Sequence, residues 1–165
     1  MKELYLVRHA KSDWGHEFLL DIDRPLNHRG YDDAYRMSSA FKEKHKIPDL
    51  LITSPATRAI GTAFIFARTF GISEQKLGIE PRIYEASANR LTDIVSDLSD
   101  QYQTVMLFGH NPGLTSFINS VSDAEIDNLP TCGIVLLSYE TNAWKKIPEQ
   151  TAHFSFSEFP REFRS

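Results

Sequence analysis

The chain has 165 residues, of which 41% are hydrophobic and 24% charged, the balance of an ordinary soluble globular protein. This length fits one domain with a proper core, and we expect a single domain over residues 1–165. The formal net charge of −4 argues against a nucleic-acid partner, because nucleic-acid-binding proteins carry a basic excess. The single cysteine, Cys132, excludes an internal disulfide framework. The N-terminus lacks a signal-peptide pattern and no stretch approaches transmembrane length, so we expect a cytoplasmic protein with no membrane partner.

The predicted elements of the first half alternate between strands and helices. Residues 4–7 are apolar and β-prone, and they predict a buried strand. Asn27 is a suitable N-cap for a helix that carries its apolar side chains on one face. Residues 50–53 predict the next strand. Ser54 then predicts a helix start, as an N-cap followed by proline at the first helical position, and Gly71 ends that helix.

The second half continues the alternation. A third helix, beginning around Asn89 and closed by Asp100, is predicted by apolar side chains at helical spacing. The remaining predictions are a strand, a helix, a strand and two weaker edge strands, at residues 105–108, 113–121, 134–139, 144–147 and 153–156. Strands that alternate with helices indicate an α/β fold. We expect three α/β/α layers around a mainly parallel central sheet that is covered on both faces.

Three predicted strands lead into cationic or titratable side chains. The first strand runs into Arg8 and His9, the second is followed by Arg58, and the third runs into His110. Open α/β sheets bind their ligands at the carboxyl ends of the strands. Two arginines and two histidines make a poor core and a good anion site, so this pattern indicates phosphoryl chemistry.

His9 is the best candidate nucleophile. An unperturbed histidine has a pKa of about 6.5, so a neutral imidazole is abundant near pH 7. Its nitrogen can attack phosphorus and hold the group as a phosphoramidate, which divides one difficult displacement into two easier ones. Arg8, Arg58 and Arg24 would neutralise the phosphoryl oxygens, and His110, if protonated, would donate one more hydrogen bond. Because phosphoryl transfer depends mainly on positioning and charge stabilisation, we expect neither a metal nor another cofactor.

Two of these assignments have alternatives. Arg24 could instead pair with Asp21 or Asp23 across the loop. His9 and His110 could belong to a zinc site, although neither an H-E-x-x-H motif nor a cluster with flanking carboxylates supports one.

Four segments of the chain, in this order, resemble the successive motifs of the histidine phosphatase superfamily, also called phosphoglycerate-mutase-like. They are residues 6–12, 23–30, 53–59 and 109–113, and residues 130–133 extend the likeness. Each motif alone is weak, but the four together are specific. The Ala10-Lys11-Ser12 variant and the short length are most similar to the SixA-type phosphohistidine phosphatase branch.

The resemblance implies a phosphoglycerate-mutase-like fold and assigns roles to individual residues. His9 would be the phosphorylated residue, Arg8, Arg58 and His110 would complete the phosphate pocket, and Arg24 would be an additional phosphate-contacting arginine. Two neighbours of these groups, Ser12 and Asn111, are also expected to bind substrate.

Glu85 lies where larger relatives carry an acidic proton donor, so the resemblance implies a general acid there. The alternative is a capping or solvated role near the following helix. Asp13 and Glu17, in the first loop, are the next candidates for the acid.

The expected function is a metal-independent phosphatase that works through phospho-His9 on phosphohistidine in a protein, of the histidine phosphotransfer type. The chain has no room for the insertions that enclose a sugar phosphate in mutases, so we expect a shallow, open pocket and a monomer. The alternatives are a phosphomonoesterase acting on small phosphoesters and a non-catalytic phosphate-recognition module, which would need the arginines but no nucleophile. Aromatic side chains near the C-terminus either cover a core edge or form a docking surface: Phe154, Phe156, Phe159 and Phe163.

Overall fold

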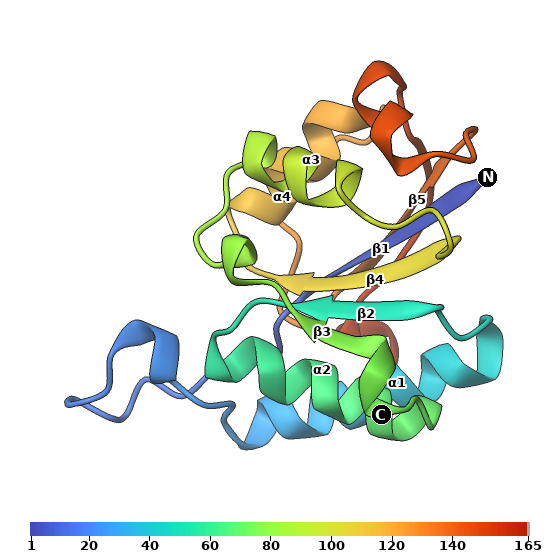
Figure 1. Cartoon of the computed structure of the whole chain (residues 1–165). Coiled ribbons are helices and arrows are strands. Elements are labelled where there is room, and N and C mark those ends of the chain that lie inside the picture. Colours follow the sequence, from blue (N-terminus) through green and yellow to red (C-terminus); the bar gives the residue numbers. More distant parts are fainter. Residues whose placement is uncertain (165) are drawn as a thin grey trace.

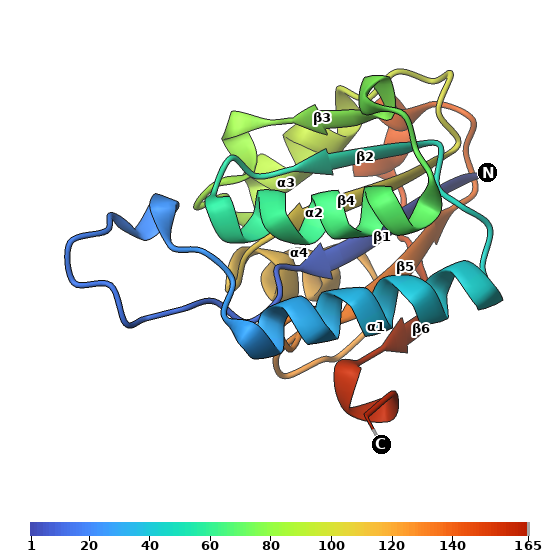
Figure 2. The ribbon, with the colours of Figure 1, turned by 90° about the horizontal axis from the view of Figure 1, so that it is seen from below.

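The computed structural model describes residues 1–164, and its centre is a six-stranded sheet with helices on both faces (Figure 1). The strands are β1 (Lys2–Arg8), β2 (Leu50–Thr53), β3 (Leu77–Ile79), β4 (Thr104–Gly109), β5 (Ile134–Tyr139) and β6 (His153–Glu158). The α-helices are α1 (His28–Lys44), α2 (Thr57–Phe70), α3 (Ala88–Ser96) and α4 (Gly113–Val121). In Figures 1 and 2, α1 and α2 cover one face and α3 and α4 the other, which confirms the predicted three layers.

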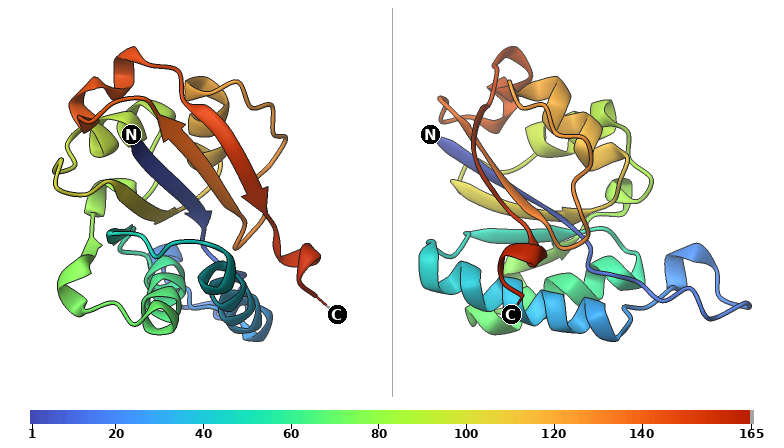
Figure 3. Two further views of the ribbon diagram at one scale, coloured as in Figure 1. Left: turned by 90° about the vertical axis from the view of Figure 1, so that its right-hand side faces the viewer. Right: turned by 180° about the vertical axis from the view of Figure 1, so that it is seen from behind.

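The sheet is mainly parallel, as predicted. Its strand order is β3-β2-β4-β1-β5-β6. The pairs β1–β4, β2–β4 and β2–β3 are parallel, whereas the pairs β1–β5 and β5–β6, at one side of the sheet, are antiparallel (Figure 3). The carboxyl ends of β1, β2 and β4 therefore lie at the same edge of the sheet, on the left in Figure 1.

Alternating side chains of β1 point into two separate cores. Leu4 and Leu6 belong to the core beneath α3 and α4, whereas Tyr5 and Val7 belong to the core beneath α1 and α2. Strands covered on both faces need apolar residues at nearly every position, which explains the uninterrupted apolar run in the sequence. The rigid, doubly covered sheet fixes the edge at which β1, β2 and β4 end.

The predicted start of α2 is wrong. The helix begins at Thr57 after Ala56, which has extended backbone angles and caps with no side chain. Ser54 directly follows β2, and its N–H donates to the carbonyl of Phe108 on the neighbouring strand β4. Its hydroxyl accepts a bond from the N–H of Ala56 and contacts His110, so it faces the carboxyl edge of the sheet and caps no helix.

Two further differences concern the strands. The predicted strand 144–147 is wrong, because Trp144–Glu149 is a 3-10 helix whose first residue bonds to Asp100 and Tyr102 instead of to a strand. β3 is not predicted from the sequence, because it has only three residues and includes a glycine. The weaker candidate at 153–156 is confirmed as part of β6.

The aromatic side chains near the C-terminus pack against the two cores. Phe154 and Phe159 lie against one core, and Phe156 and Phe163 lie against the other. Of the two alternatives, cover for the core edge is confirmed. Among residues 1–164, no helix combines the length and the apolarity that crossing a membrane requires.

Candidate active site

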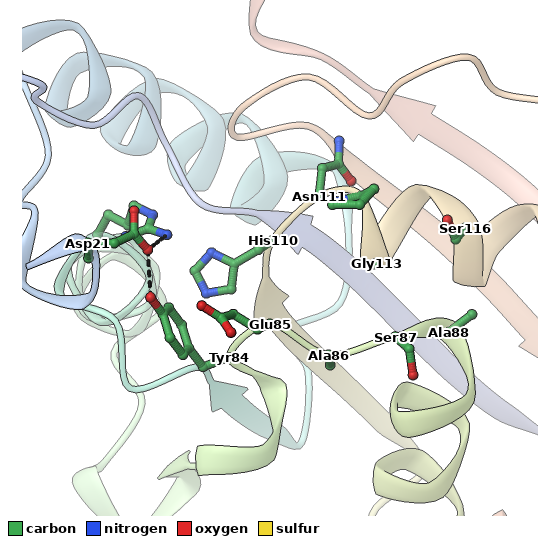
Figure 4. A pocket seen from close by; sticks show the side chains of 12 residues that line it. Asp21, Tyr84, Glu85, Ala86, Ser87, Ala88, His110, Asn111, Gly113 and Ser116 are labelled. Carbon is green, nitrogen blue, oxygen red and sulfur yellow. Dashed lines mark hydrogen bonds and ion pairs between the residues drawn. The ribbon is translucent and has the colours of Figure 1, made fainter.

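A cavity of about 500 Å³ opens at the carboxyl edge of the sheet (Figure 4). Its wall combines residues of four segments: Asp21, Arg58, Tyr84, Glu85, Ala86, Ser87, Ala88, His110, Asn111, Pro112, Gly113 and Ser116. Four of the predicted site residues thus meet in one place: Arg58, Glu85, His110 and Asn111. His9 adjoins them, because its ring centroid lies 5.2 Å from that of His110.

His9 is buried, neutral and held in one tautomer. Its Nδ1 lies 2.7 Å from the carbonyl oxygen of Ala10, an acceptor only, so Nδ1 carries the proton and donates. Nε2 therefore keeps its lone pair. Burial lowers the pKa of His9 to about 3; the bond to Ala10 opposes this shift, and nearby His110, Arg58 and Arg8 add to it. The neutral imidazole expected from the sequence is therefore present. Burial of the ring, which the sequence analysis did not consider, is what keeps it neutral.

His110 is also neutral here. Burial, followed by the charge of Arg58, lowers its pKa to about 4. Its Nε2 lies 2.7 Å from Oγ of Ser54, and the ring of Tyr84 meets it edge-on at 5.6 Å. The protonated donor considered from the sequence is absent at pH 7 in this arrangement, so His110 donates as a neutral imidazole.

Arg58 and Arg8 bring concentrated positive charge to this edge. Arg58 donates from Nη1 to the main-chain oxygen of Asp21 at 2.7 Å and from Nη2 to its Oδ2 at 3.0 Å. Arg8 donates to the carbonyl of Leu129, and burial together with Arg58 lowers its pKa. Within the described chain, Nε of both arginines and Nδ1 of His110 are buried without a hydrogen-bond partner. Buried polar nitrogens are normally paired, so these three indicate a place for an oxyanion.

Arg24 is fixed at the base of the first loop. Its Nε pairs with Oδ1 of Asp21 at 3.1 Å, and its Nη1 donates to Oγ of Ser12 at 2.6 Å. The guanidinium also lies 3.5 Å from the ring centroid of Trp14. The alternative pairing of Arg24 with Asp21 is therefore present, and Ser12 serves to position Arg24.

Asp21 connects the loop to the cavity wall, and the sequence analysis noted it only as a partner for Arg24. Besides the two arginines, its carboxylate accepts the hydroxyl of Tyr84 at 2.6 Å. The Tyr84 bond first, and then Arg58 and Arg24, lower the pKa of Asp21 to about 2, against the opposing effect of burial. The carboxylate is thus an internal anion bound to the cationic groups of the site.

Glu85 lines the cavity in a strained conformation. Its φ is 56°, in the left-handed region that non-glycine residues seldom adopt. Figure 4 shows its side chain directed into the cavity beside His110. Asp13, by contrast, bonds to the N–H of Gly15 and pairs with His16.

Asn111 lies in the wall, but its side chain already has partners. The amide nitrogen donates to Asn128 and Leu129, and the oxygen accepts from the N–H and hydroxyl of Thr115. These bonds tie the β4–α4 turn to the following loop, which favours a structural role over contact with substrate.

Sequence reasoning missed three side chains of the site: Ser54, Tyr84 and, as a cavity residue, Asp21. The only signal for Tyr84 was its position next to Glu85. Across residues 1–164, His, Cys, Asp and Glu side chains form no group of three or more that could hold a metal ion.

The chain is similar in sequence to one protein family and to individual proteins. The family model of the histidine phosphatase superfamily (branch 1) matches residues 4–89. An uncharacterized chloroplastic protein of Arabidopsis thaliana is 32% identical over 153 residues, which are 88% of this chain and 70% of that protein. Phosphoglycerate mutase 1 of Saccharomyces cerevisiae is 42% identical over 67 residues, but this match covers only 27% of the mutase.

Solved structures show the same architecture. A candidate phosphohistidine phosphatase SixA from Agrobacterium tumefaciens has a TM-score of 0.75 and 28% identity, covering 83% of this chain and 91% of that one. The protein histidine phosphatase SixA complexed with tungstate has a TM-score of 0.83 over 98% of this chain and 99% of that one. Its 15% identity makes this second match one of fold alone.

Proposed function

The chain belongs to the histidine phosphatase superfamily, and on that premise we propose that it is a metal-independent phosphatase that removes phosphate from phosphohistidine in a protein. The observation that carries the proposal is the arrangement around His9. A neutral imidazole with a free Nε2 lone pair lies among buried, unpaired nitrogens of Arg8, Arg58 and His110.

In the first step, Nε2 of His9 attacks the phosphorus of the substrate phosphohistidine. A new P–N bond forms to His9 as the substrate's P–N bond breaks, and the substrate imidazole leaves after gaining a proton. The hydrogen bond from Nδ1 to Ala10 fixes the ring and stabilises the positive charge that develops on it. The leaving imidazole has a conjugate-acid pKa near 6.5, so solvent can supply much of this proton.

In the second step, water attacks the phosphoryl group on His9. A P–O bond forms, the P–N bond to His9 breaks, and inorganic phosphate leaves with the imidazole restored. Arg8, Arg58 and His110 would donate to the phosphoryl oxygens in both steps, with Arg24 behind them. Such donors act most strongly where charge develops in a site that excludes water. Glu85, beside His110 in the cavity, would protonate leaving groups more basic than imidazole.

The openness of the site supports a protein-borne phosphoryl group. The cavity lies at the sheet edge, and the turn from β4 into α4, which forms part of its wall, is short. The similarity to SixA-type structures supports the same substrate class.

The test is turnover by the purified protein of a phosphohistidine-bearing protein against a panel of small phosphomonoesters, each with and without EDTA. We expect the phosphohistidine protein to give the highest kcat/KM and EDTA to change nothing. Higher kcat/KM for a small phosphomonoester, or activity lost to EDTA and restored by zinc, would contradict the proposal. Tight phosphate binding with no turnover of any substrate would favour the recognition module.

A further inference from the structure

The loop between β1 and α1 projects away from the rest of the molecule (Figures 1 and 2), and its residue Asp21 lines the cavity. We call residues 13–20 of this loop the arm. The N–H of Asp13 donates to the carbonyl of Pro25, and Ser12 pairs with Leu26 in an isolated antiparallel bridge. These contacts hold the start of the arm next to the residues at which the loop returns to the rest of the molecule, Pro25 and Leu26.

The arm exposes large apolar side chains. Phe18 is 98% exposed, Trp14 73% and Leu20 70%, and Leu19 is exposed as well. Nine large hydrophobic side chains are exposed among residues 1–164, and four of them lie within seven consecutive positions of this loop. Single exposed apolar side chains are normal, but a contiguous group marks a binding surface.

One end of the arm contacts a side chain assigned to phosphate, and the other end adjoins a residue of the cavity wall. Trp14 stacks on Arg24 at one end. At the other end, Leu20 directly precedes Asp21, which bonds to Arg58 and Tyr84 in the cavity wall. A protein whose phosphoryl group occupies the cavity would therefore lie against the arm.

The negative charge of the arm limits the kinds of partner that can bind it. Asp13 and Glu17 are acidic, and residues 13–20 contain no lysine or arginine. An anionic lipid surface would repel such a segment, since membrane-binding segments carry basic clusters. The arm of a second copy would carry the same acidic charge. A protein surface that combines apolar and basic side chains fits best.

We propose that the arm is the docking surface for the phosphoprotein substrate, with Phe18, Leu19 and Leu20 packing against an apolar patch beside the phosphorylated histidine. This inference rests on the proposed function and adds to it the surface that distinguishes a protein substrate from a small one. Exposed aromatic and aliphatic side chains at the centre of a contact supply most of its binding energy.

The experiment compares two substrates that share the same scissile bond. One is free phosphohistidine, and the other is a histidine phosphotransfer domain phosphorylated with phosphoramidate. The variant Phe18→Ser/Leu20→Ser removes two apolar side chains that the fold leaves in solvent. The matched control, Phe64→Ser, removes a 51% exposed phenylalanine from α2, outside the arm.

For the arm variant, we expect KM for the phosphorylated domain to rise about tenfold while kcat holds, which corresponds to a loss of about 1.4 kcal/mol of binding free energy. Its kcat/KM on free phosphohistidine, and both activities of Phe64→Ser, should match the wild type. Equal losses on both substrates, or no loss on either, would overturn the inference.

Two further measurements test the substrate class and the occupant of the arm separately. Wild-type protein that hydrolyses phosphomonoesters but not the phosphorylated domain would overturn the proposed function, before any variant is compared. Sedimentation and flotation of the wild type and the arm variant test a second copy and a lipid surface as occupants. An arm-dependent dimer, or arm-dependent binding to phosphatidylserine vesicles, would overturn the docking assignment. A wild type that stays monomeric and unbound, beside the KM effect, supports it.

Discussion

Tyr84 donates its hydroxyl to Oδ2 of Asp21 at 2.6 Å, although the two residues are 63 positions apart in the chain. The same oxygen accepts from Nη2 of Arg58 at 3.0 Å. Arg58, an arginine that we assign to phosphate, is thus already paired with a carboxylate through its Nη2, while its Nε has no partner. The negative charge of Asp21 opposes the binding of a phosphoryl group at Arg58.

Replacing Asp21 with asparagine should therefore strengthen phosphate binding. The change removes the competing charge and keeps the size of the side chain. Because the carboxylate is half exposed, we expect a modest gain, with the Kd for inorganic phosphate falling about two- to fivefold by calorimetry. The control is Asp23→Asn, because Asp21 and Asp23 lie in one short 3-10 helix, Asp21–Asp23. Weaker phosphate binding by Asp21→Asn would mean instead that Asp21 positions Arg58 for the substrate.

Lysine should not replace arginine at the site. Arg8→Lys and Arg58→Lys keep the positive charge but lose the planar, bidentate donor geometry. We expect kcat to fall roughly a hundred- to a thousandfold, the usual effect of removing one preorganised charge-stabilising donor. Arg68→Lys serves as the control, because Arg68 lies near the far end of α2, away from the cavity wall. Nearly full activity with lysine at both positions would show that point charge alone is sufficient.

Glu85→Gln should affect two substrate classes differently. An alkoxide leaving group needs a proton in the transition state, so a general acid contributes about a hundredfold or more to phosphomonoester hydrolysis. Imidazole is a far better leaving group, and phosphohistidine hydrolysis should slow much less. Both rates are measured on one preparation, with thermal melting as the folding control. An equal loss on both substrates would assign Glu85 a structural role at its strained backbone position.

Acid should destabilise the fold through the two active-site histidines. Their pKa values fall from 6.5 to about 3 for His9 and about 4 for His110. Between pH 6.5 and these values the unfolded chain binds more protons than the folded chain, so the free energy of unfolding decreases as the pH falls through this window.

The matching variant is His9→Asn, in which one of these groups no longer titrates. Its urea midpoint should decrease less between about pH 7 and about pH 5 than that of the wild type. The control is His28→Asn, which removes a 97% exposed imidazole outside the site. If His9→Asn keeps the full pH dependence, then the burial of His9 is not its source.

The layers and the cationic groups could be predicted because both follow from local patterns. Continuous apolar runs such as residues 4–7 occur where a strand is covered on both faces, and parallel strands bring their carboxyl ends together. Arg8, His9 and His110 directly follow such runs, so their common edge required no knowledge of side-chain contacts.

The contacts of Asp21, Tyr84 and Ser54 could not be predicted in this way. Asp21 reaches the cavity only because the loop folds back over 37 positions to Arg58, and no local pattern encodes that return. Ser54 followed by proline has the local chemistry of a helix start, but the bond from its N–H to Phe108 holds it beside β4 instead. At both Asp21 and Ser54, contacts with residues distant in the sequence determine the local structure.

The most direct test is the identity of the phosphorylated residue. The protein is mixed with an isotopically labelled phosphohistidine protein, quenched in alkali within one turnover, digested and mapped by mass spectrometry. The account predicts label on His9 that is stable in alkali and released by acid, as expected of a phosphoramidate, and no label in His9→Ala. Label that persists in His9→Ala, or that maps to Cys132 or a serine, would contradict it.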